Sequence, residues 1–325
     1  MIQKPLRGLL LVSLLVTSDG LAGSRRDLGK GSLFLGMADN DRYIVYFRPN
    51  NLELGEYTFG RMITFDRAEN REWGISDSSS IYENLSVRWS THEQCLVVSD
   101  GKQVYGIDIS SGKTRKEYFK ADSLAVVICF AMAPNGLDYC VAIRRIEAES
   151  TKVRFLRRSI LKHDQMELCS WDDSSAGEVL IPKALWGNNH DVSLLMPQPR
   201  ASLLYFTDGR STPVDTSVRS LHFLRDRKLF YSKVIGNKSV LFRWDVKKGS
   251  RLDIMSGEGV EFSYVGPYGS DRCIAVGVEQ ELLLYCQDTR KVHKLSSFPK
   301  GRCLYLGDGF EILEVNRHLT LLRVE

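Results

Sequence analysis

Short apolar stretches separated by polar turns fill the chain from residue 23 to its end. Between Val97 and Lys113, an apolar run meets an Asp-Gly turn, a second apolar run follows, and a Ser-Ser-Gly-Lys turn closes the stretch. Apolar runs of about four to eight residues bounded by such turns are typical of β-strands joined in hairpins. No helical periodicity competes with this pattern beyond Ala22. The chain is therefore expected to be all-β.

The hairpin belongs to a repeat. Seven pairs of apolar runs joined by tight turns recur in phase, and in six units an aspartate then ends a further strand. The carboxylate of such an aspartate can accept hydrogen bonds from backbone N–H groups two or three residues further on. A four-stranded repeat of about 40–45 residues is the signature of a β-propeller blade. The six aspartates are Asp66, Asp108, Asp164, Asp208, Asp245 and Asp288.

Seven blades fit the length, since residues 23–325 comprise 303 residues, or about 43 per blade. A six-bladed ring would leave the last apolar pair, Leu304 to Val315, without a blade. The final unit ends after three strands, and the segment Ser24–Lys30 is expected to supply the fourth, because closing the ring protects the last exposed sheet edges. The sequence thus predicts a single seven-bladed β-propeller of four-stranded blades over residues 23–325, closed by its N-terminal segment.

Three segments, residues 97–113, 238–250 and 280–291, resemble blades of WD40-like propellers. Trp244-Asp245 matches the dipeptide that names that family, and Asp100-Gly101 matches its turn between the second and third strands. The sequence has no Gly-His dipeptide, so the His–Asp–Ser–Trp hydrogen-bond set of WD40 blades cannot be assembled. The likeness is therefore to the degenerate propellers found in exported proteins, and it implies a fold rather than an activity.

The segment from Met1 to Ala22 follows a different pattern. Lys4 and Arg7 precede a short apolar run, and the small residues Gly20 and Ala22 follow it. These are the parts of a secretory signal peptide, and the run is too short to span a bilayer, which takes about 20 residues. We predict that residues 1–22 are a signal peptide cleaved near Ala22, and that the protein is exported, periplasmic or secreted, without a membrane anchor. A buried N-terminal strand or helix is the alternative.

Charge and cysteine content narrow the classes of partner. The net charge is +4 and the basic residues do not cluster, so no nucleic-acid partner is expected. The seven cysteines show no CxxC or Cys/His spacing, so no metal site is expected. Cys129 and Cys140 are equidistant from one hairpin turn, as are Cys273 and Cys286 from another, and an oxidising compartment could link each pair. Buried free cysteines are the alternative.

Catalytic motifs are missing from the sequence. It has no nucleophile elbow, phosphate loop or dinucleotide fingerprint, and no cofactor is expected. Asp172 and Asp173 stand side by side, whereas acid/base work needs two carboxylates across a cleft. His222 falls in an inner strand, from which it could reach the central channel, although an isolated histidine there is more often packed and hydrogen-bonded.

We therefore expect a non-catalytic propeller that acts as a protein-binding or scaffold module, with another protein as its partner. Two alternatives stay open: a hydrolase or lactonase-type enzyme with its site at the channel mouth, and a secreted inhibitor or immunity-type factor. The enzyme hypothesis predicts carboxylates, histidines or arginines that converge on the channel from different blades.

Partner binding is expected at the connection between the second and third strands of blade 1, where about a dozen residues separate Phe47 from Arg61. Long connections on a rigid scaffold often carry function, and exposed arginine and aromatic side chains are enriched at binding hot spots. Two segments between blades should emerge on the same face. An insert packed on its own blade is the alternative. The candidate partner-binding residues are Arg48, Asn51, Tyr57, Phe59, Tyr82, Glu83, Trp171 and Asp172.

Overall fold

The computed structural model describes residues 25–323, with the exception of 55–56, 76–79, 82–84, 148–149, 162–163, 174–181, 188–189, 197–200, 269–272 and 298–300. The predicted signal peptide, residues 1–22, lies outside the described residues. The described part of the chain consists of strands and turns, and no helix in it is long and apolar enough to cross a membrane.

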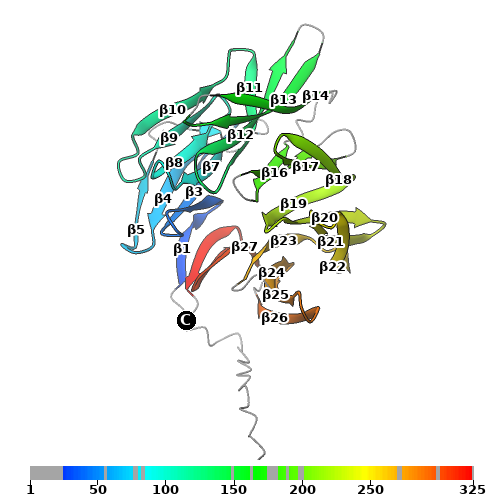
Figure 1. Ribbon diagram of the computed structural model, residues 1–325. Helices are drawn as coiled ribbons and strands as arrows, with labels where there is room; N and C mark the ends of the chain where they lie inside the picture. The colour runs from blue at the N-terminus through cyan, green and yellow to red at the C-terminus, as the bar shows by residue number, and fades with distance from the viewer. Residues whose placement is uncertain are drawn as a thin grey trace, which may run out of the picture.

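Seven antiparallel sheets stand around one axis as the blades of a β-propeller (Figure 1). The chain enters each blade at the strand nearest the axis and then moves outward. The predicted fold class and blade number are confirmed. The inner strands are β2 (Leu33–Ala38), β7 (Ser86–Ser90), β11 (Ala125–Met132), β15 (Lys183–Trp186), β19 (Val218–Arg225), β23 (Phe262–Pro267) and β27 (Gly301–Gly307).

The remaining strands complete the blades in chain order. In blades 1 to 3 they are β3 (Tyr43–Leu54), β4 (Tyr57–Asp66), β5 (Arg71–Gly74), the short β6 (Ser80–Ile81) beside β4, β8 (Cys95–Ser99), β9 (Gln103–Ile107), β10 (Thr114–Lys120), β12 (Asp138–Ile146), β13 (Thr151–Ser159) and β14 (Gln165–Asp172). In blades 4 to 7 they are β16 (Asp191–Met196), β17 (Ser202–Thr207), β18 (Arg210–Asp215), β20 (Lys228–Ile235), β21 (Lys238–Asp245), β22 (Ser250–Glu258), β24 (Cys273–Val278), β25 (Glu281–Cys286), β26 (Lys291–Ser297), β28 (Phe310–Val315) and β29 (His318–Arg323).

The N-terminal segment closes the ring, as the sequence predicts. Strand β1 (Arg25–Lys30) pairs antiparallel with β29 and forms the outer strand of the sheet that contains β27 to β29. His318 Nδ1 lies 2.8 Å from Asp27 Oδ2 across this pair. Where this sheet packs against blade 1, Leu28 and Phe310 are buried with Ile44 of blade 1 in one apolar cluster. Hydrogen bonding therefore joins the N-terminal segment to the last blade, and apolar packing joins the last blade to the first.

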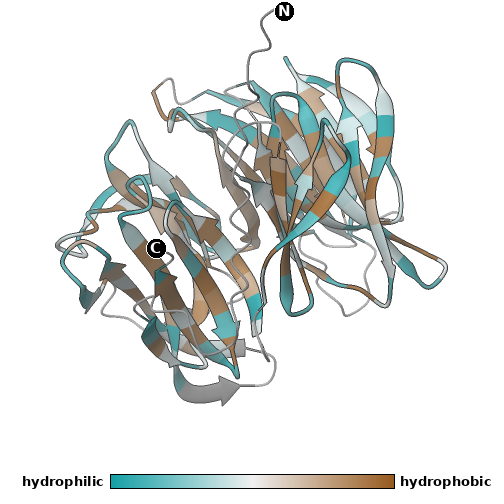
Figure 2. Cartoon of the chain, turned by 90° about the horizontal axis from the view of Figure 1, so that it is seen from below, coloured by the Kyte–Doolittle hydropathy of each residue, from teal (hydrophilic) through white to brown (hydrophobic). Residues whose placement is uncertain are grey.

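Apolar packing between the faces of neighbouring sheets forms the core. In Figure 2 the apolar residues run along the strands and the hydrophilic ones gather at the turns. Between blades 4 and 5, the rings of Tyr205 and Trp244 meet edge to face with centroids 5.7 Å apart. Between blades 3 and 4, Trp186 Nε1 donates a hydrogen bond of 3.2 Å to the carbonyl of Ala131. Each blade thus depends on its neighbours for burial, as is typical of propellers.

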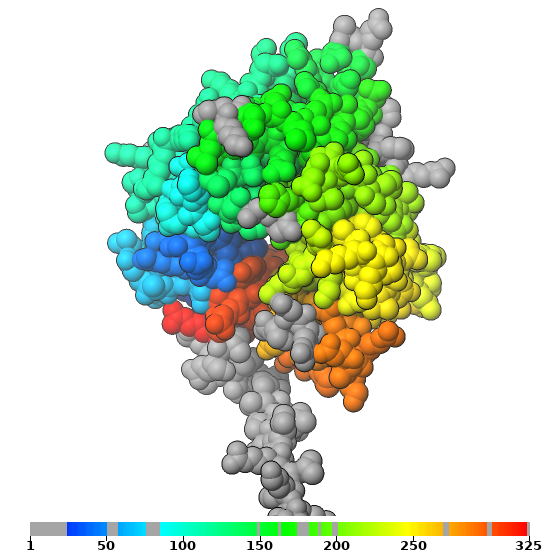
Figure 3. Space-filling model, viewed as in Figure 1, coloured from blue at the N-terminus to red at the C-terminus, as the bar shows by residue number. Residues whose placement is uncertain are grey.

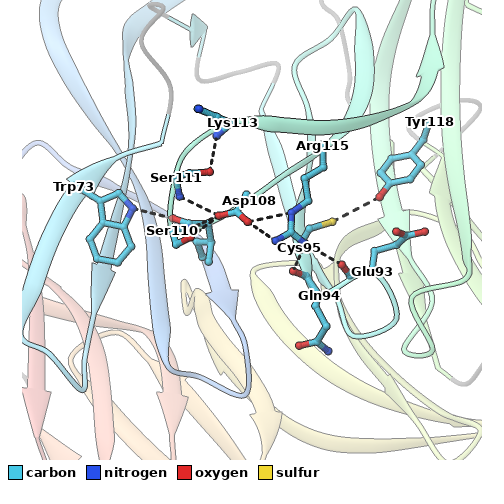
Figure 4. Close-up of polar contacts among 11 residues, drawn as sticks. Trp73, Glu93, Gln94, Cys95, Asp108, Ser110, Ser111, Lys113, Arg115 and Tyr118 are labelled. Carbon is cyan, nitrogen blue, oxygen red and sulfur yellow. Dashed lines mark hydrogen bonds and ion pairs between the residues drawn. The ribbon is translucent and has the colours of Figure 1, made fainter.

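Three of the six repeated aspartates cap turns in the structure, and Asp108 shows how. Its Oδ1 accepts hydrogen bonds from the backbone N–H groups of Ser110 and Ser111, at 3.0 and 2.9 Å (Figure 4). Its Oδ2 is paired with Arg115, whose guanidinium also donates to the carbonyl oxygen of Gln94 at 3.1 Å. Asp66 and Asp245 cap their turns in the same way, by accepting hydrogen bonds from the N–H groups two and three residues further on. At these three positions the aspartate serves the fold.

The hairpin register agrees with the prediction for one cysteine pair and contradicts it for the other. Cys273 lies directly opposite Cys286, as expected. Cys129 lies opposite Ala142, and Cys140 lies opposite Ala131, so the prediction that Cys129 and Cys140 face each other is wrong. The tight turn spans Ala133 to Asp138, one residue further along the chain than a symmetric arrangement of the two cysteines requires. All seven cysteines are free thiols in the structure.

Candidate site on the ring axis

Four polar side chains lie at corresponding levels on consecutive inner strands. Each blade begins with its inner strand, so the inner strands run in the same direction along the axis. Arg88 lies two residues before the end of β7, and Cys129, Lys183 and His222 each lie three residues before the end of β11, β15 and β19. Blades 2 to 5 therefore bring two cationic groups, a thiol and an imidazole to one part of the axis.

A β-bulge sets the position of His222. The pairing of β19 with β20 shifts between Leu221 and Phe223, and His222 has no partner across the ladder. A bulge leaves its extra residue unpaired and redirects its side chain, and bulges are common near functional sites. A similar shift in β11 comes immediately before Cys129. The local backbone thus departs from regular pairing at two of the four positions.

Electrostatic interactions connect the four side chains in their order around the ring. Burial raises the pKa of the Cys129 thiol to about 11, against the opposing influence of the nearby Arg88 and Lys183 charges. Burial lowers the pKa of Lys183, and repulsion from the Arg88 guanidinium lowers it further. The Lys183 charge in turn acts on His222. Because the thiol is neutral near pH 7, Cys129 does not compensate the positive charges beside it.

The two cations have no acidic partner in the described part of the chain. Arg88 Nη1 donates a hydrogen bond of 2.7 Å to the carbonyl of the preceding residue, Val87. Lys183 is exposed to solvent, although burial and the Arg88 charge lower its pKa. Unpaired positive charges in low-dielectric surroundings attract anions. This part of the axis is therefore suited to an anionic ligand.

His222 is neutral at physiological pH. Burial, with a smaller contribution from the Lys183 charge, lowers its pKa to about 3. Its Nε2 lies 3.1 Å from Oγ of the buried Ser232, and its ring meets the edge of Phe262. When Nε2–H donates to Ser232, Nδ1 keeps its lone pair and can accept a proton. A neutral imidazole with a free lone pair can act as a base.

The long connection predicted in blade 1 is not a loop. Strands β3 and β4 continue through it as an extended hairpin, with a register shift between Pro49 and Glu53. Arg48 is held in this blade, since its guanidinium pairs with Glu72 at 3.1 Å and bonds the Tyr46 hydroxyl at 2.9 Å. Pairing continues on both sides of this shift, so the extra residues lengthen the hairpin of blade 1 itself.

The other candidate partner-binding residues are scattered. Phe59 is half-buried and lies opposite Ile81 of β6. Asn51 and Tyr57 belong to β3 and β4, and only their backbone is described. Tyr82 and Glu83 lie outside the described residues.

Trp171 and Asp172 end the outer strand β14 rather than emerging on a loop between blades. Trp171 packs against the core shared by blades 3 and 4, and Asp172 is exposed. The structure does not bring these two residues near Arg48 in one site, because they belong to blades 3 and 1.

Of the axis cluster, the sequence predicts a place near the channel for His222 alone, as a histidine on an inner strand. It does not single out Arg88 or Lys183. Their only sequence signal is a basic residue within a short inner strand, in Ser86–Ser90 and Lys183–Trp186. Once the blades are assigned, a basic residue on an inner strand is the feature to look for.

No known family model matches the sequence, and no curated protein is similar to it at the level of sequence. The fold resembles solved structures. An oligogalacturonate lyase in complex with manganese is 9% identical over 94% of this chain and 96% of its own, with a TM-score of 0.68. An acylaminoacyl peptidase from Pyrococcus horikoshii is 10% identical over 87% of this chain and 49% of its own, with a TM-score of 0.58. The β-propeller domain of the Trilobed protease from Pyrococcus furiosus is 10% identical over 89% of this chain and 94% of its own, with a TM-score of 0.56.

These comparisons correct the functional expectation. The propellers that resemble this chain belong to enzymes, a lyase and peptidases, which contradicts the prediction of a non-catalytic scaffold and favours the enzyme alternative. At this level of identity the likeness itself shows the fold alone. The axis cluster is the convergence of basic side chains from different blades that the enzyme hypothesis predicts.

Proposed function

We propose that this protein is an enzyme whose active site lies on the ring axis and whose substrate carries a carboxylate. The observation that supports this proposal is the convergence of Arg88 and Lys183, two cations without an acidic partner in the described part of the chain, with the neutral His222. The reaction that fits these groups is removal of a proton from the carbon next to the carboxylate.

The two cations would act on the carboxylate. The planar guanidinium of Arg88 suits bidentate binding of a carboxylate, and Lys183 adds a point charge. When the adjacent C–H bond is broken, negative charge moves onto the carboxylate oxygens, where both cations stabilise it. These interactions strengthen in the transition state, which is the condition for faster chemistry rather than tighter binding alone.

His222 would accept the proton. Nδ1 takes it, the C–H electron pair forms a carbon–carbon double bond, and an oxygen substituent on the next carbon leaves with its own bonding pair. General base catalysis of this kind contributes about 10²- to 10⁴-fold in rate. The protonated imidazole can then return its proton to the departing oxygen.

An acidic oligosaccharide has all the required parts. A uronate unit carries a carboxylate, an acidic C–H beside it and a glycosidic oxygen one carbon further on. The oligogalacturonate lyase that shares this fold acts, by its name, on an oligomer of such a sugar acid. We infer that oligouronates are the substrate class to test first.

That lyase was solved with manganese, which raises the question of a matching ligand set in this chain. Among residues 25–323, apart from the undescribed gaps, no group of three or more His, Cys, Asp or Glu side chains is placed to hold a metal ion. These residues do not fit such a centre, and the proposed reaction routes no step through one.

The test is an assay of purified protein with oligogalacturonate, in which elimination creates an unsaturated uronate that absorbs ultraviolet light. We expect His222→Gln to lower kcat by at least about 10²-fold. Arg88→Gln and Lys183→Gln should lower kcat and also raise KM, because both cations bind the carboxylate. His92→Gln, in an exposed turn of blade 2, is the matched control and should retain full activity.

Two outcomes would decide against this proposal. Turnover that persists in the His222→Gln protein would remove the histidine as base. Hydrolysis of a lactone or ester without an unsaturated product would replace elimination by the hydrolase chemistry that the sequence left open.

A further inference from the structure

Cys273 and Cys286 form a close thiol pair in blade 6, far from the axis cluster in sequence and in a different blade. They are directly opposed on β24 and β25, and Cys273 Sγ donates to Cys286 Sγ across 3.2 Å. Sulfur atoms so placed on opposed residues need little movement to reach bonding distance. The pair is therefore preorganised for a covalent link.

Both thiols can be reached from outside. Each of the two residues is half-buried, whereas Cys95, Cys140 and Cys303 are buried. Cys273 also lines a small pocket between blades 5 and 6, together with Arg225, Lys228 and Gln287. A small reactant that enters this pocket meets Cys273 first. The lining carries two basic residues, Arg225 and Lys228, and one acidic residue, Asp226, whose Oδ2 lies 3.7 Å from Arg225 Nε. The net charge of the lining is therefore positive, which suits an anionic reactant.

We propose that Cys273 and Cys286 are a redox-active dithiol that reacts with small, negatively charged disulfides. The Cys273 thiolate attacks one sulfur of the small disulfide, whose S–S bond breaks and releases one thiol. Cys286 then attacks Cys273 in the resulting mixed disulfide and releases the second thiol. The protein gives up two electrons and two protons, the small disulfide takes them up, and one internal S–S bond has formed.

The link would form beside a contact between blades. Gln287 follows Cys286 directly, and its Oε1 accepts a hydrogen bond of 2.6 Å from Arg243 Nη1 of blade 5. A disulfide between Cys273 and Cys286 would thus cross-link β24 and β25 of blade 6 beside the hydrogen bond that joins this hairpin to blade 5. This inference is independent of the proposed catalytic activity.

The experiment incubates the folded, full-length protein with oxidised glutathione, an anionic disulfide, and counts thiols after quenching and unfolding. Wild-type protein should lose two of its seven thiols and bind no glutathione, and peptide mapping should recover Cys273 joined to Cys286. Cys286→Ser should instead retain glutathione on Cys273, because no resolving thiol is present. Cys169→Ser, a half-buried cysteine of blade 3, is the matched control and should still lose two thiols.

Three results would overturn the proposal. The first is a wild-type protein that keeps all its thiols under conditions that oxidise a dithiol peptide. The second is a glutathione adduct that persists in wild-type protein. The third is an internal link that maps to other cysteines.

Discussion

The surroundings of single residues in this propeller set opposite charge states: one group is held neutral and another is held ionised. His222 is held neutral by burial and by the nearby Lys183 charge. Asp108 is held ionised by hydrogen bonds from Ser110, Arg115 and Ser111. The type of residue is visible in the sequence, but its protonation state is set by neighbours from other strands. This is why His222 could be placed on an inner strand from the sequence while its pKa could not.

Glu311 gives a residue-scale prediction about stability. It is 6% exposed, its Oε2 has no hydrogen-bond partner among the described residues, and burial raises its pKa. A raised carboxyl pKa stabilises the fold at low pH, below the unfolded value, and this contribution is lost as the pH rises through the folded value. Glu311→Gln should therefore stabilise the protein at pH 7, on the order of 1 kcal/mol, and give no advantage near pH 4.

Urea unfolding of both proteins at the two pH values measures this difference. Glu117→Gln, at an exposed position of β10, is the control and should leave the difference between the two pH values unchanged. A Glu311→Gln protein that is less stable than wild type at pH 7 would mean that the carboxylate is stabilised by the fold.

At the scale of elements, strands and turns follow from local pattern, whereas exact register does not. For blade 2 the sequence predicts strands at residues 85–89, 95–99, 103–109 and 114–119. Strands β7 to β10 agree with these ranges within one or two residues. In the β11–β12 hairpin the turn lies one residue further along the chain than the two cysteines require, and this moves Cys129 away from Cys140. A bulge at Ile128 then shifts the register again beyond Cys129. A bulge is a response to packing against neighbouring blades, and apolar alternation alone does not encode it.

The capped turn of blade 2 gives the element-scale prediction. Asp108 joins its own turn to Arg115, and Arg115 reaches the carbonyl of Gln94 in the neighbouring turn (Figure 4). Asp108→Ala should lower the free energy of unfolding by about 1–3 kcal/mol, since hydrogen bonds to a charged group are lost. Because the pKa of Asp108 is lowered in the folded state, this loss should be full near neutral pH and shrink as the pH falls below the unfolded value of an aspartate.

Denaturant unfolding of the Asp108→Ala protein at neutral and acidic pH measures this loss, with Glu117→Ala in the adjacent strand as the comparison. Equal stability of the Asp108→Ala and wild-type proteins at neutral pH would show that the turn is formed by its backbone alone.

At the scale of the whole molecule, the ring creates the candidate site. Arg88 and His222 are separated by three blade boundaries in the sequence, and only the closed arrangement of inner strands brings them together. The number of blades and the closing strand were predictable from repeat length and from the need to protect sheet edges. The sequence did not predict which side chains of the inner strands would meet, because this depends on how far each strand extends along the axis. The space-filling view shows the blades in contact around the ring (Figure 3).

Export gives a prediction about the intact protein. If residues 1–22 are a signal peptide, cleavage near Ala22 leaves the mature chain starting just ahead of β1, at Arg25. N-terminal sequencing of exported protein should therefore begin near Gly23. Exported material that still carries Met1 would contradict the predicted cleavage and leave this N-terminal segment as part of the mature protein.

The closing strand gives the last prediction. Removal of residues 23–30 from the mature protein would delete β1 and leave the edge of β29 without its partner. It would also remove Leu28, which is 1% exposed in the core between the last and first blades. We expect this truncation to aggregate, because an exposed sheet edge pairs with other chains, and to lose several degrees of melting temperature. Size-exclusion chromatography and thermal unfolding measure both effects, and protein that starts at Gly23 is the control. A monomeric truncation that melts with the control would show that the ring holds without its closing strand.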